Sequence, residues 1–130
     1  MPVERLSWRA GNEAVMTDAL GKKLGQLQEI TISVTGRKSG RKISNPVWFV
    51  LEGERLYLLP VKGSETQWYR NVLAGSSLRV EARGAEGEFK AVPITERAQV
   101  AAVVEKFREK YGSGDVKKYY SGFDVAVVVE

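Results

Sequence analysis

The sequence contains no cysteine and no histidine among its 130 residues. The absence of cysteine excludes disulfide bonds, thiolate metal sites and a cysteine nucleophile. The absence of histidine excludes a Ser-His-Asp triad, a Cys-His pair and a histidine-ligated zinc site. An enzyme with this sequence therefore has to use carboxylates, lysine, tyrosine or hydroxyl groups, or has to leave the chemistry to a cofactor. We predict no metal site.

Long hydrophobic runs are also absent. No segment approaches the ~18 consecutive apolar residues of a membrane-spanning helix, and residues 1–15 carry charges where a signal peptide has its apolar region. We therefore expect a cytoplasmic protein without stable membrane insertion. The length suits one domain that buries a core without covalent cross-links.

The surplus of positive charge is concentrated in the middle of the chain. The formal net charge is +4, and residues 35–80 hold eight of the 20 Lys and Arg residues but only three of the 16 Asp and Glu residues. A local basic cluster of this kind indicates an anionic partner more strongly than a generally basic composition does.

The apolar pattern predicts an α+β fold with five or six antiparallel strands and two or three helices. The predicted strands are residues 30–35, 46–51, 55–61, 78–84, 87–94 and 123–129. The predicted helices are residues 12–25, residues 64–74 and a longer helix after Thr95, with residues 114–121 as a connector of one turn. We expect a single domain over residues 1–130, with an N-terminal helical segment at 1–27 and the body at 28–130.

Local signals support several of these elements. Ser64 followed by Gln67 is a capping-box pattern, and Thr95 is a candidate N-cap. Two hairpins are predicted, with turns at 52–54 and at 85–86. The longer helix carries core residues at helical spacing, namely Val100, Val103, Val104, Phe107 and Tyr111. Several strands are apolar on consecutive residues, so both of their faces have to be covered, which favours a small barrel with helices outside it.

The segment VTGRKSGRKISNP, residues 34–46, predicts an anion-binding loop. Gly36 and Gly40 allow successive backbone N–H groups to converge on an anion. Ser39 adds a hydroxyl donor, and the cations Arg37, Lys38, Arg41 and Lys42 add charge. The spacing matches neither a Walker loop nor G-x-G-x-x-G. The structural alternative is a solvated basic turn.

A second candidate anion site is VKGSETQW, residues 61–68, which runs from a strand into a helix N-terminus. Trp48, Trp68 and Tyr69 lie near the two candidate anion sites in the predicted fold. Together these features suit a flat aromatic ligand with several acidic groups. The alternative for the tryptophans is ordinary core packing.

Four motifs are in register over roughly residues 30–82: Thr35-Gly36-Arg37-Lys38-Ser39-Gly40, Pro46, Lys62-Gly63 and Trp68-Tyr69-Arg70-Asn71. In these motifs the chain resembles the deazaflavin-dependent nitroreductase family. The resemblance implies a small antiparallel split β-barrel of the FMN-binding type with two or three flanking helices. It also implies coenzyme F-420 as the cofactor and hydride transfer to a quinone, a nitro compound or a similar electron-poor acceptor.

The resemblance further implies roles for individual residues. Those expected to bind the phosphate and acidic tail of the cofactor are Lys38, Ser39, Arg41 and Lys62, with Gly63 and Ser64 offering N–H groups. Those expected at the ring are Pro46 and Val47 at its border and Trp68 and Asn71 in the pocket wall. Tyr119 and Tyr120 are expected on the substrate side, where a hydroxyl group could donate a hydrogen bond or a proton.

The sequence departs from the family pattern near the cofactor. The family usually has an arginine where Ile43 stands, and we expect Lys42 to take its place, without the bidentate fork of an arginine. The segment between Gly63 and Trp68 is shorter than usual and lacks a proline. These departures leave FMN as the alternative cofactor, with haem or no cofactor as further alternatives.

Other functions remain open from the sequence. The chain could store or carry a flavin-like cofactor without turnover. Binding of nucleic acid through GRKSGRK is a weaker hypothesis, because the cations flank a glycine turn and do not cover a face; we expect no nucleic-acid partner. We expect a homodimer, since three helices would not cover every apolar strand face.

Overall fold

The computed structural model describes residues 29–130 except 54, 76 and 83–84. The predicted helix 12–25 and the predicted N-terminal segment 1–27 lie outside the described residues. Within the described residues no helix is long and apolar enough to cross a membrane.

Seven antiparallel strands form one curled sheet in the order β2-β1-β5-β6-β7-β4-β3. The strands are β1 (Ile30–Thr35), β2 (Lys42–Val47), β3 (Phe49–Glu52), β4 (Arg55–Leu58), β5 (Ser77–Ala82), β6 (Ala85–Ile94) and β7 (Ala126–Val129). The helices are η1 (Gly63–Glu65), a 3-10 turn, and α2 (Gln67–Gly75), α3 (Arg97–Tyr111) and α4 (Ser113–Tyr119). The two edge strands, β2 and β3, follow each other in the chain with only Trp48 between them. This arrangement confirms the predicted α+β split barrel with flanking helices.

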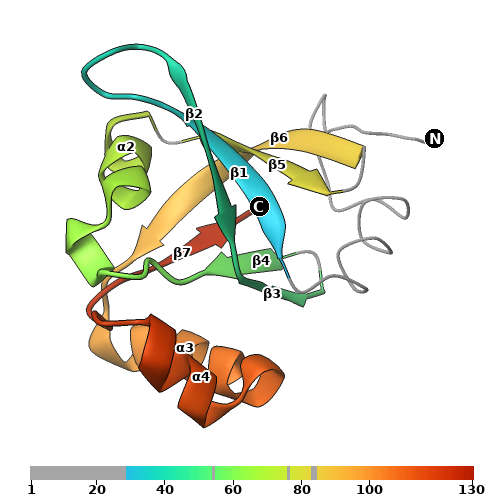
Figure 1. Cartoon of the computed structure of the whole chain (residues 1–130), viewed down its shortest axis with the longest axis vertical. Coiled ribbons are helices and arrows are strands. Elements are labelled where there is room, and N and C mark those ends of the chain that lie inside the picture. Colours follow the sequence, from blue (N-terminus) through green and yellow to red (C-terminus); the bar gives the residue numbers. More distant parts are fainter. Residues whose placement is uncertain (1–28, 54, 76, 83–84) are drawn as a thin grey trace.

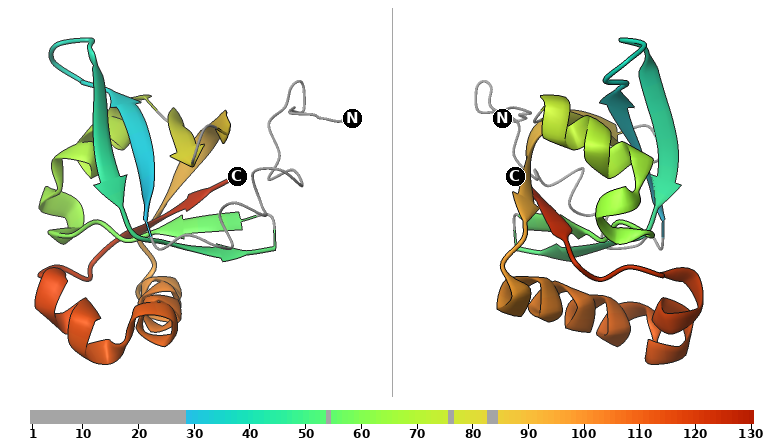
Figure 2. Two further views of the ribbon diagram at one scale, coloured as in Figure 1. Left: turned by 45° about the vertical axis from the view of Figure 1, so that its right-hand side comes forward. Right: turned by 90° about the vertical axis from the view of Figure 1, so that its left-hand side faces the viewer.

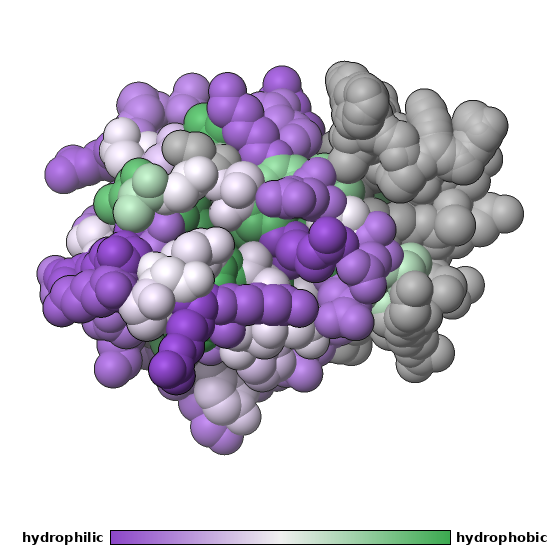
Figure 3. All heavy atoms as spheres, turned by 90° about the horizontal axis from the view of Figure 1, so that it is seen from above, coloured by the Kyte–Doolittle hydropathy of each residue, from purple (hydrophilic) through white to green (hydrophobic). Residues whose placement is uncertain are grey.

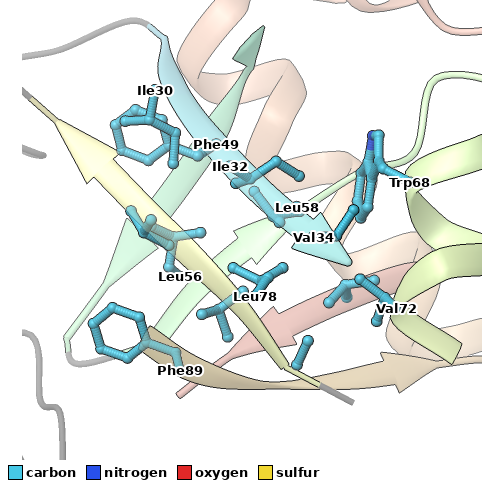
Figure 4. Packing of buried hydrophobic residues seen from close by; sticks show 14 of the residues in the cluster. Ile30, Ile32, Val34, Phe49, Leu56, Leu58, Trp68, Val72, Leu78 and Phe89 are labelled. Atoms are coloured by element: carbon cyan, nitrogen blue, oxygen red, sulfur yellow. The ribbon is translucent and has the colours of Figure 1, made fainter. Parts of the chain in front are cut away.

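Strand β7 is buried on both faces, as its run of consecutive apolar residues predicts, whereas β5 and β6 alternate between buried and more exposed residues. The larger core lies inside the barrel, where Leu56 and Leu58 of β4 meet Ile32 of β1 and Val72 of α2 (Figure 4). The smaller core lies outside β4, where Leu59 packs with side chains of α3 and α4. Figure 1 shows α3 and α4 together below the sheet, while α2 lies at the opposite end beside β1.

The main error of the sequence prediction concerns the basic loop. Residues 42–46 are not loop but the first part of β2, which pairs along its whole length with β1. The actual loop is residues 36–41, at the tip of the β1–β2 hairpin. Pro46 fits a strand here because β2 is an edge strand, where a missing backbone N–H breaks no ladder.

Several element boundaries also differ from the prediction. Ala85 and Glu86 are not a hairpin tip but belong to β6, paired with β5. The N-cap of α3 is Glu96 and not Thr95, since the Glu96 carboxylate accepts a hydrogen bond from the Gln99 N–H at 2.9 Å. Ser64 does not cap α2, which begins only at Gln67.

The C-terminal part departs from the prediction in two ways. The expected connector at residues 114–121 is a seven-residue helix, α4. The last strand is shorter than predicted and covers only Ala126–Val129. Residues 123–125, which the prediction includes in the strand, instead lead into β7, and Asp124 is hydrogen-bonded to Ser64 of η1. This segment has consequences for the candidate site.

Candidate functional site

The loop at the tip of the β1–β2 hairpin is closed by its own backbone. The Gly36 N–H donates to the Arg41 carbonyl at 2.8 Å, and the Gly40 N–H donates to the Gly36 carbonyl at 2.9 Å. Gly40 has φ +72°, a conformation that favours glycine. The Ser39 hydroxyl accepts a hydrogen bond from the Arg41 N–H at 3.2 Å, so its own proton is left to donate.

Helix α2 fixes the loop through one arginine. The Arg37 backbone N–H and Nη1 both donate to Oδ1 of Asn71, at 3.1 and 2.7 Å. Arg37 Nη2 donates to Oε1 of Gln67 at 3.0 Å. Asn71 is buried, with 4% of its surface exposed. Figure 2 shows the result, with α2 standing beside the hairpin that carries the loop.

A cavity of about 420 Å³ lies between this loop and α2. Its lining residues come from the loop, from β2 and from the start of α2: Gly36, Arg37, Lys38, Ser39, Ile43, Asn45, Thr66, Gln67, Trp68 and Asn71. We call it the loop cavity. Its lining includes two cations and no carboxylate among the described residues, so it suits an anionic group.

A second cavity of about 440 Å³ adjoins the first. Its lining is mostly apolar and aromatic: Glu29, Asn45, Pro46, Val47, Trp48, Leu59, Val61, Thr66, Trp68, Tyr119 and Tyr120. We call it the aromatic cavity. Asn45, Thr66 and Trp68 line both cavities. The two cavities therefore adjoin, one with cations and the other with aromatic side chains in its lining.

Buried polar groups of the aromatic cavity lack partners among the described residues. The Tyr120 hydroxyl group belongs to a side chain that is only 6% exposed, and no hydrogen bond joins it to another described residue. The Trp68 indole N–H is similarly without an acceptor in a residue that is 5% exposed. Figure 4 places this nitrogen at the end of the ring farthest from Val72. Buried polar groups normally have partners, so these donors are available to a ligand.

The aromatic rings around Trp48 form the floor of this cavity. Trp48 stacks on Tyr111, with ring centroids 4.2 Å apart, and meets Tyr119 edge-on at 5.6 Å. Burial raises the pKa of the Tyr120 hydroxyl, with Tyr111 as a second cause. Burial also raises the pKa of Tyr111 to about 12. Both hydroxyl groups therefore stay protonated at neutral pH.

The second predicted anion site is already filled by the chain itself. Ser64 donates its N–H to Oδ1 of Asp124 at 3.0 Å and its hydroxyl group to Oδ2 at 2.6 Å. The Gly63 N–H is also used, because it donates to the Pro60 carbonyl at 3.1 Å. The hydrogen bonds from Ser64 lower the pKa of Asp124. A carboxylate thus stands where the sequence suggested a cofactor phosphate.

The segment that carries Asp124 fits closely against this turn. Gly63 has φ +58°, and a Cβ atom there would lie 2.0 Å from Oδ1 of Asp124. Gly122 forms a parallel bridge with Lys62, and a Cβ atom at Gly122 would lie 2.7 Å from the Gly63 nitrogen. The Ser121 N–H donates to the Val61 carbonyl at 2.8 Å. These contacts position the neighbouring Tyr119 and Tyr120 in the wall of the aromatic cavity.

The structure brings most of the sequence-predicted site residues together. Lys38, Ser39, Trp68 and Asn71 line the loop cavity, and Pro46, Val47, Trp68, Tyr119 and Tyr120 line the aromatic cavity. Five predicted residues line neither cavity: Arg41, Lys42, Lys62, Gly63 and Ser64.

Lys42 lies on the opposite side of the sheet from position 43. Ile43 and Val34 are paired on the inner face, as are Asn45 and Ile32. Side chains alternate along a strand, so Lys42 points to the outer face, where it lines a small cavity with Arg79 and Glu88. On this geometry Lys42 does not line the loop cavity, and its role in place of an arginine stays a prediction.

Sequence reasoning misses Asn45 and Thr66, which line the cavities, and Asp124, which occupies the Ser64 turn. It names Arg37 as a cation but does not reveal its orientation by Asn71. Asn45 lies in a segment that the sequence pattern assigns to a loop, which hides its inward direction. Asp124 is 60 residues from Ser64, and Asn71 is 34 residues from Arg37. No local pattern marks such distant partners. In the described part of the chain, no group of three or more carboxylates could hold a metal ion.

A family model matches residues 21–124, which is most of the chain. The chain belongs to the DUF2255 family. This family is described as an uncharacterized protein conserved in bacteria. A comparison with curated proteins gives no match.

Solved structures with the same fold include proteins of different function. An F-420-H2-dependent reductase is 20% identical, with a TM-score of 0.62 over 79% of this chain and 94% of that chain. A domain-swapped dimer is 20% identical, with a TM-score of 0.63 over 79% and 80%. HutZ, the heme storage protein from Vibrio cholerae, is 12% identical, with a TM-score of 0.63 over 88% and 87%. At these identities the likeness establishes the fold.

Proposed function

We propose that the chain binds a flavin-like redox cofactor, coenzyme F-420, and acts as a deazaflavin-dependent reductase of a quinone, a nitro compound or a similar small electron-poor acceptor. The observation that carries the proposal is the pair of adjoining cavities that share Asn45, Thr66 and Trp68. An aromatic end and a cationic end suit a ligand with a flat ring and an acidic tail.

The residues present fit such a cofactor in size and in donor chemistry. Each cavity falls within the roughly 300–1,000 Å³ of small-molecule sites. Pro46, Val47 and Trp68 offer apolar walls for the ring system. Arg37, Lys38 and the Ser39 hydroxyl group offer donors for a phosphate. The resemblance of the four motifs to the deazaflavin-dependent nitroreductases, and the fold of the F-420-H2-dependent reductase, support the same choice.

In this proposal the protein supplies binding, orientation and protons. When bound, reduced deazaflavin supplies a hydride. The chain has neither histidine nor cysteine, so the proton that accompanies the hydride comes from a carboxyl group, a lysine, a tyrosine hydroxyl group or water. Tyr119 and Tyr120 line the cavity and are its candidate donors toward an acceptor oxygen. The raised pKa of Tyr120 keeps its hydroxyl group protonated, which favours a hydrogen-bond donor over a base.

A fluorescence titration with oxidised F-420 and, in parallel, with FMN tests the cofactor. We expect saturable micromolar binding of F-420 and weaker binding of FMN. Binding of FMN alone would keep the site and replace the cofactor. Binding of neither would overturn the proposal, and a haem titration would then test the function named for HutZ.

Oxidation of reduced F-420 in the presence of menadione or a nitroaromatic compound tests the reaction. We expect a rate above that of a sample without protein. Tyr119→Phe should lower the rate without changing cofactor affinity, because Tyr119 lines the cavity and is 51% exposed. Tyr57→Phe is the matched control, since Tyr57 lies on the outer face of β4. Tight binding without any turnover would favour a carrier or storage protein.

We also propose a homodimer and a single domain over the whole chain. Val61 and Tyr119, which line the aromatic cavity, and Phe123 are large apolar residues that are 41–51% exposed. A second copy could cover them. A molar mass from light scattering that equals one chain would overturn the dimer.

A further inference from the structure

Among the described residues, the guanidinium group of Arg37 has a different kind of partner from those of four other arginines. These four pair with carboxylates: Arg55 with Glu130, Arg70 with Glu65, Arg79 with Glu86 and Arg108 with Glu105. The Arg37 guanidinium group is instead held by two amide oxygens, Oδ1 of Asn71 at 2.7 Å and Oε1 of Gln67 at 3.0 Å. Its orientation is fixed while its charge is not neutralised.

The hydrogen-bonding capacity of Arg37 is also only partly used. A guanidinium group has five N–H donors, and the two amide oxygens take two of them. The remaining donors allow a bidentate contact with an oxyanion. The loop cavity that Arg37 lines also contains Lys38 and the Ser39 hydroxyl group.

We propose that Arg37 is the principal anion-binding group of the site, that Asn71 is its positioning residue, and that the anion it selects is a phosphate or diphosphate group. This inference rests on the proposed function and names the ligand chemistry of the same site. A neutral acceptor at position 71 is essential to it, because a carboxylate there would bind Arg37 equally well and cancel its charge. Two uncompensated cations at the cavity match a dianion better than a single carboxylate.

The start of α2 adds to this preference. Gln67 and Trp68 are its first two residues, and both line the loop cavity. The positive end of the helix dipole therefore faces the same space as Arg37. At the other predicted anion site, Asp124 already accepts the hydrogen bond of the Ser64 hydroxyl group, so the loop cavity is the place left for the anion.

The test is the affinity for inorganic pyrophosphate, measured by calorimetry on the whole chain. Asn71→Asp keeps the size of the side chain and its acceptor for Arg37 but adds a negative charge. We expect this variant to bind pyrophosphate at least about 10-fold more weakly than wild type. Gln99→Glu adds the same charge on the exposed face of α3 and should change the affinity less than about 2-fold, because distant surface charges are screened.

A double-variant cycle separates positioning from a direct contact. Asn71→Ala adds no charge to the cavity that Asn71 lines, so if Asn71 acts through Arg37 this variant should cause no further loss of pyrophosphate affinity in the Arg37→Ala background. A further loss there, or unchanged pyrophosphate binding by Asn71→Asp, would overturn the inference. Should Asn71→Asp fail to fold, Gln67→Glu brings a carboxylate to the exposed side of Arg37 and should lower the affinity in the same way.

The outcome is distinguishable from that of the proposed function. Pyrophosphate binding that depends on Arg37, without binding of F-420 or FMN, would support this inference while the proposed function fails. F-420 binding that is unchanged in Arg37→Ala would leave the proposed function standing and overturn the inference. Absence of pyrophosphate binding by the wild type, or stronger binding of a dicarboxylate such as succinate, would also overturn it.

Discussion

The Gly36–Arg41 loop and the Lys62–Ser64 turn have similar sequences but different surroundings. Each combines glycine, lysine and serine next to the end of a strand, and the sequence predicts an anion site at each. In the turn, the Asp124 carboxylate takes both the N–H and the hydroxyl group of Ser64. In the loop, the Asn71 amide orients Arg37 and leaves its charge available. The comparison shows that the residue brought in from a distance decides whether the donors of a basic turn are already occupied or remain available.

The backbone N–H groups of the turn are also occupied. Lys62 donates its N–H to the Thr66 hydroxyl group at 2.8 Å, and the Gly63 N–H is bound to Pro60 at 3.1 Å. Donors of the turn are thus satisfied within the chain. A ligand anion would have to replace Asp124 there, whereas in the loop cavity it replaces water.

The largest effect is expected from Gly63→Ala. The substitution places a Cβ atom 2.0 Å from Asp124 Oδ1 at a residue with φ +58°, so it strains the backbone by about 1–3 kcal/mol and also breaks the Asp124 contact. Gly40→Ala is the matched control, because φ is +72° but nothing lies within 4 Å. It should cost only about 1–2 kcal/mol. Urea unfolding measures both, and a Gly40→Ala loss as large as that of Gly63→Ala would contradict the close fit.

Asn71→Ala is expected to have the next largest effect. The variant leaves the Arg37 N–H and guanidinium group without their buried acceptor, which costs about 1–3 kcal/mol. Gln67→Ala removes the exposed acceptor of the same arginine and should stay within about 0.5 kcal/mol of wild type. Thermal unfolding compares the two variants. Equal losses would mean that the loop does not depend on its buried anchor.

Asp124→Asn should give a smaller, pH-dependent effect. The folded pKa of Asp124 is lowered by its hydrogen bonds from Ser64, so its contribution is present above the unfolded pKa and is lost as the pH falls through the folded pKa. Because Asp124 is exposed, we expect at most about 1 kcal/mol at pH 7. The difference between wild type and variant in the free energy of unfolding should shrink toward pH 3. A difference that grows on acidification would contradict the assigned sign.

The smallest effects are expected from the substitution of Lys38 and of Lys62. Lys38 lines the loop cavity and Lys62 lines neither cavity. Lys38→Ala should weaken pyrophosphate binding by about 3- to 5-fold, in line with an exposed ion pair of up to about 1 kcal/mol. Lys62→Ala should change it less than about 2-fold. The reverse order, measured at one ionic strength, would move the anion site to the turn.

The two faces of the β1–β2 hairpin differ in the side chains that they carry. Seen from above, the described surface is mostly hydrophilic, with smaller hydrophobic areas between and beside the polar side chains (Figure 3). On the outer face of β1 and β2 the Ser33 and Ser44 hydroxyl groups are 2.9 Å apart. The ligand-sized space is on the inner side of the same strands.

Composition and local patterns are sufficient to predict the fold class and to name eight of the residues that line the two cavities. Consecutive apolar residues in β4 and β7 require a sheet that is covered on both faces, and the helical spacing of Val100, Val103 and Phe107 places α3 against it. Glycines and cations locate the loop, because special backbone conformations and charge are local properties. The lack of histidine and cysteine limits the chemistry from composition alone.

Tertiary contacts, in contrast, determine in which basic turn the donors and the charge remain available. The alternation of β2 turns Lys42 outward and Asn45 inward, and this depends on a strand register that the local pattern does not reveal. Asp124 reaches Ser64, and Asn71 reaches Arg37, across long stretches of chain. Pairings of this kind arise when the sheet closes and brings distant segments together, so no local pattern of residues contains them.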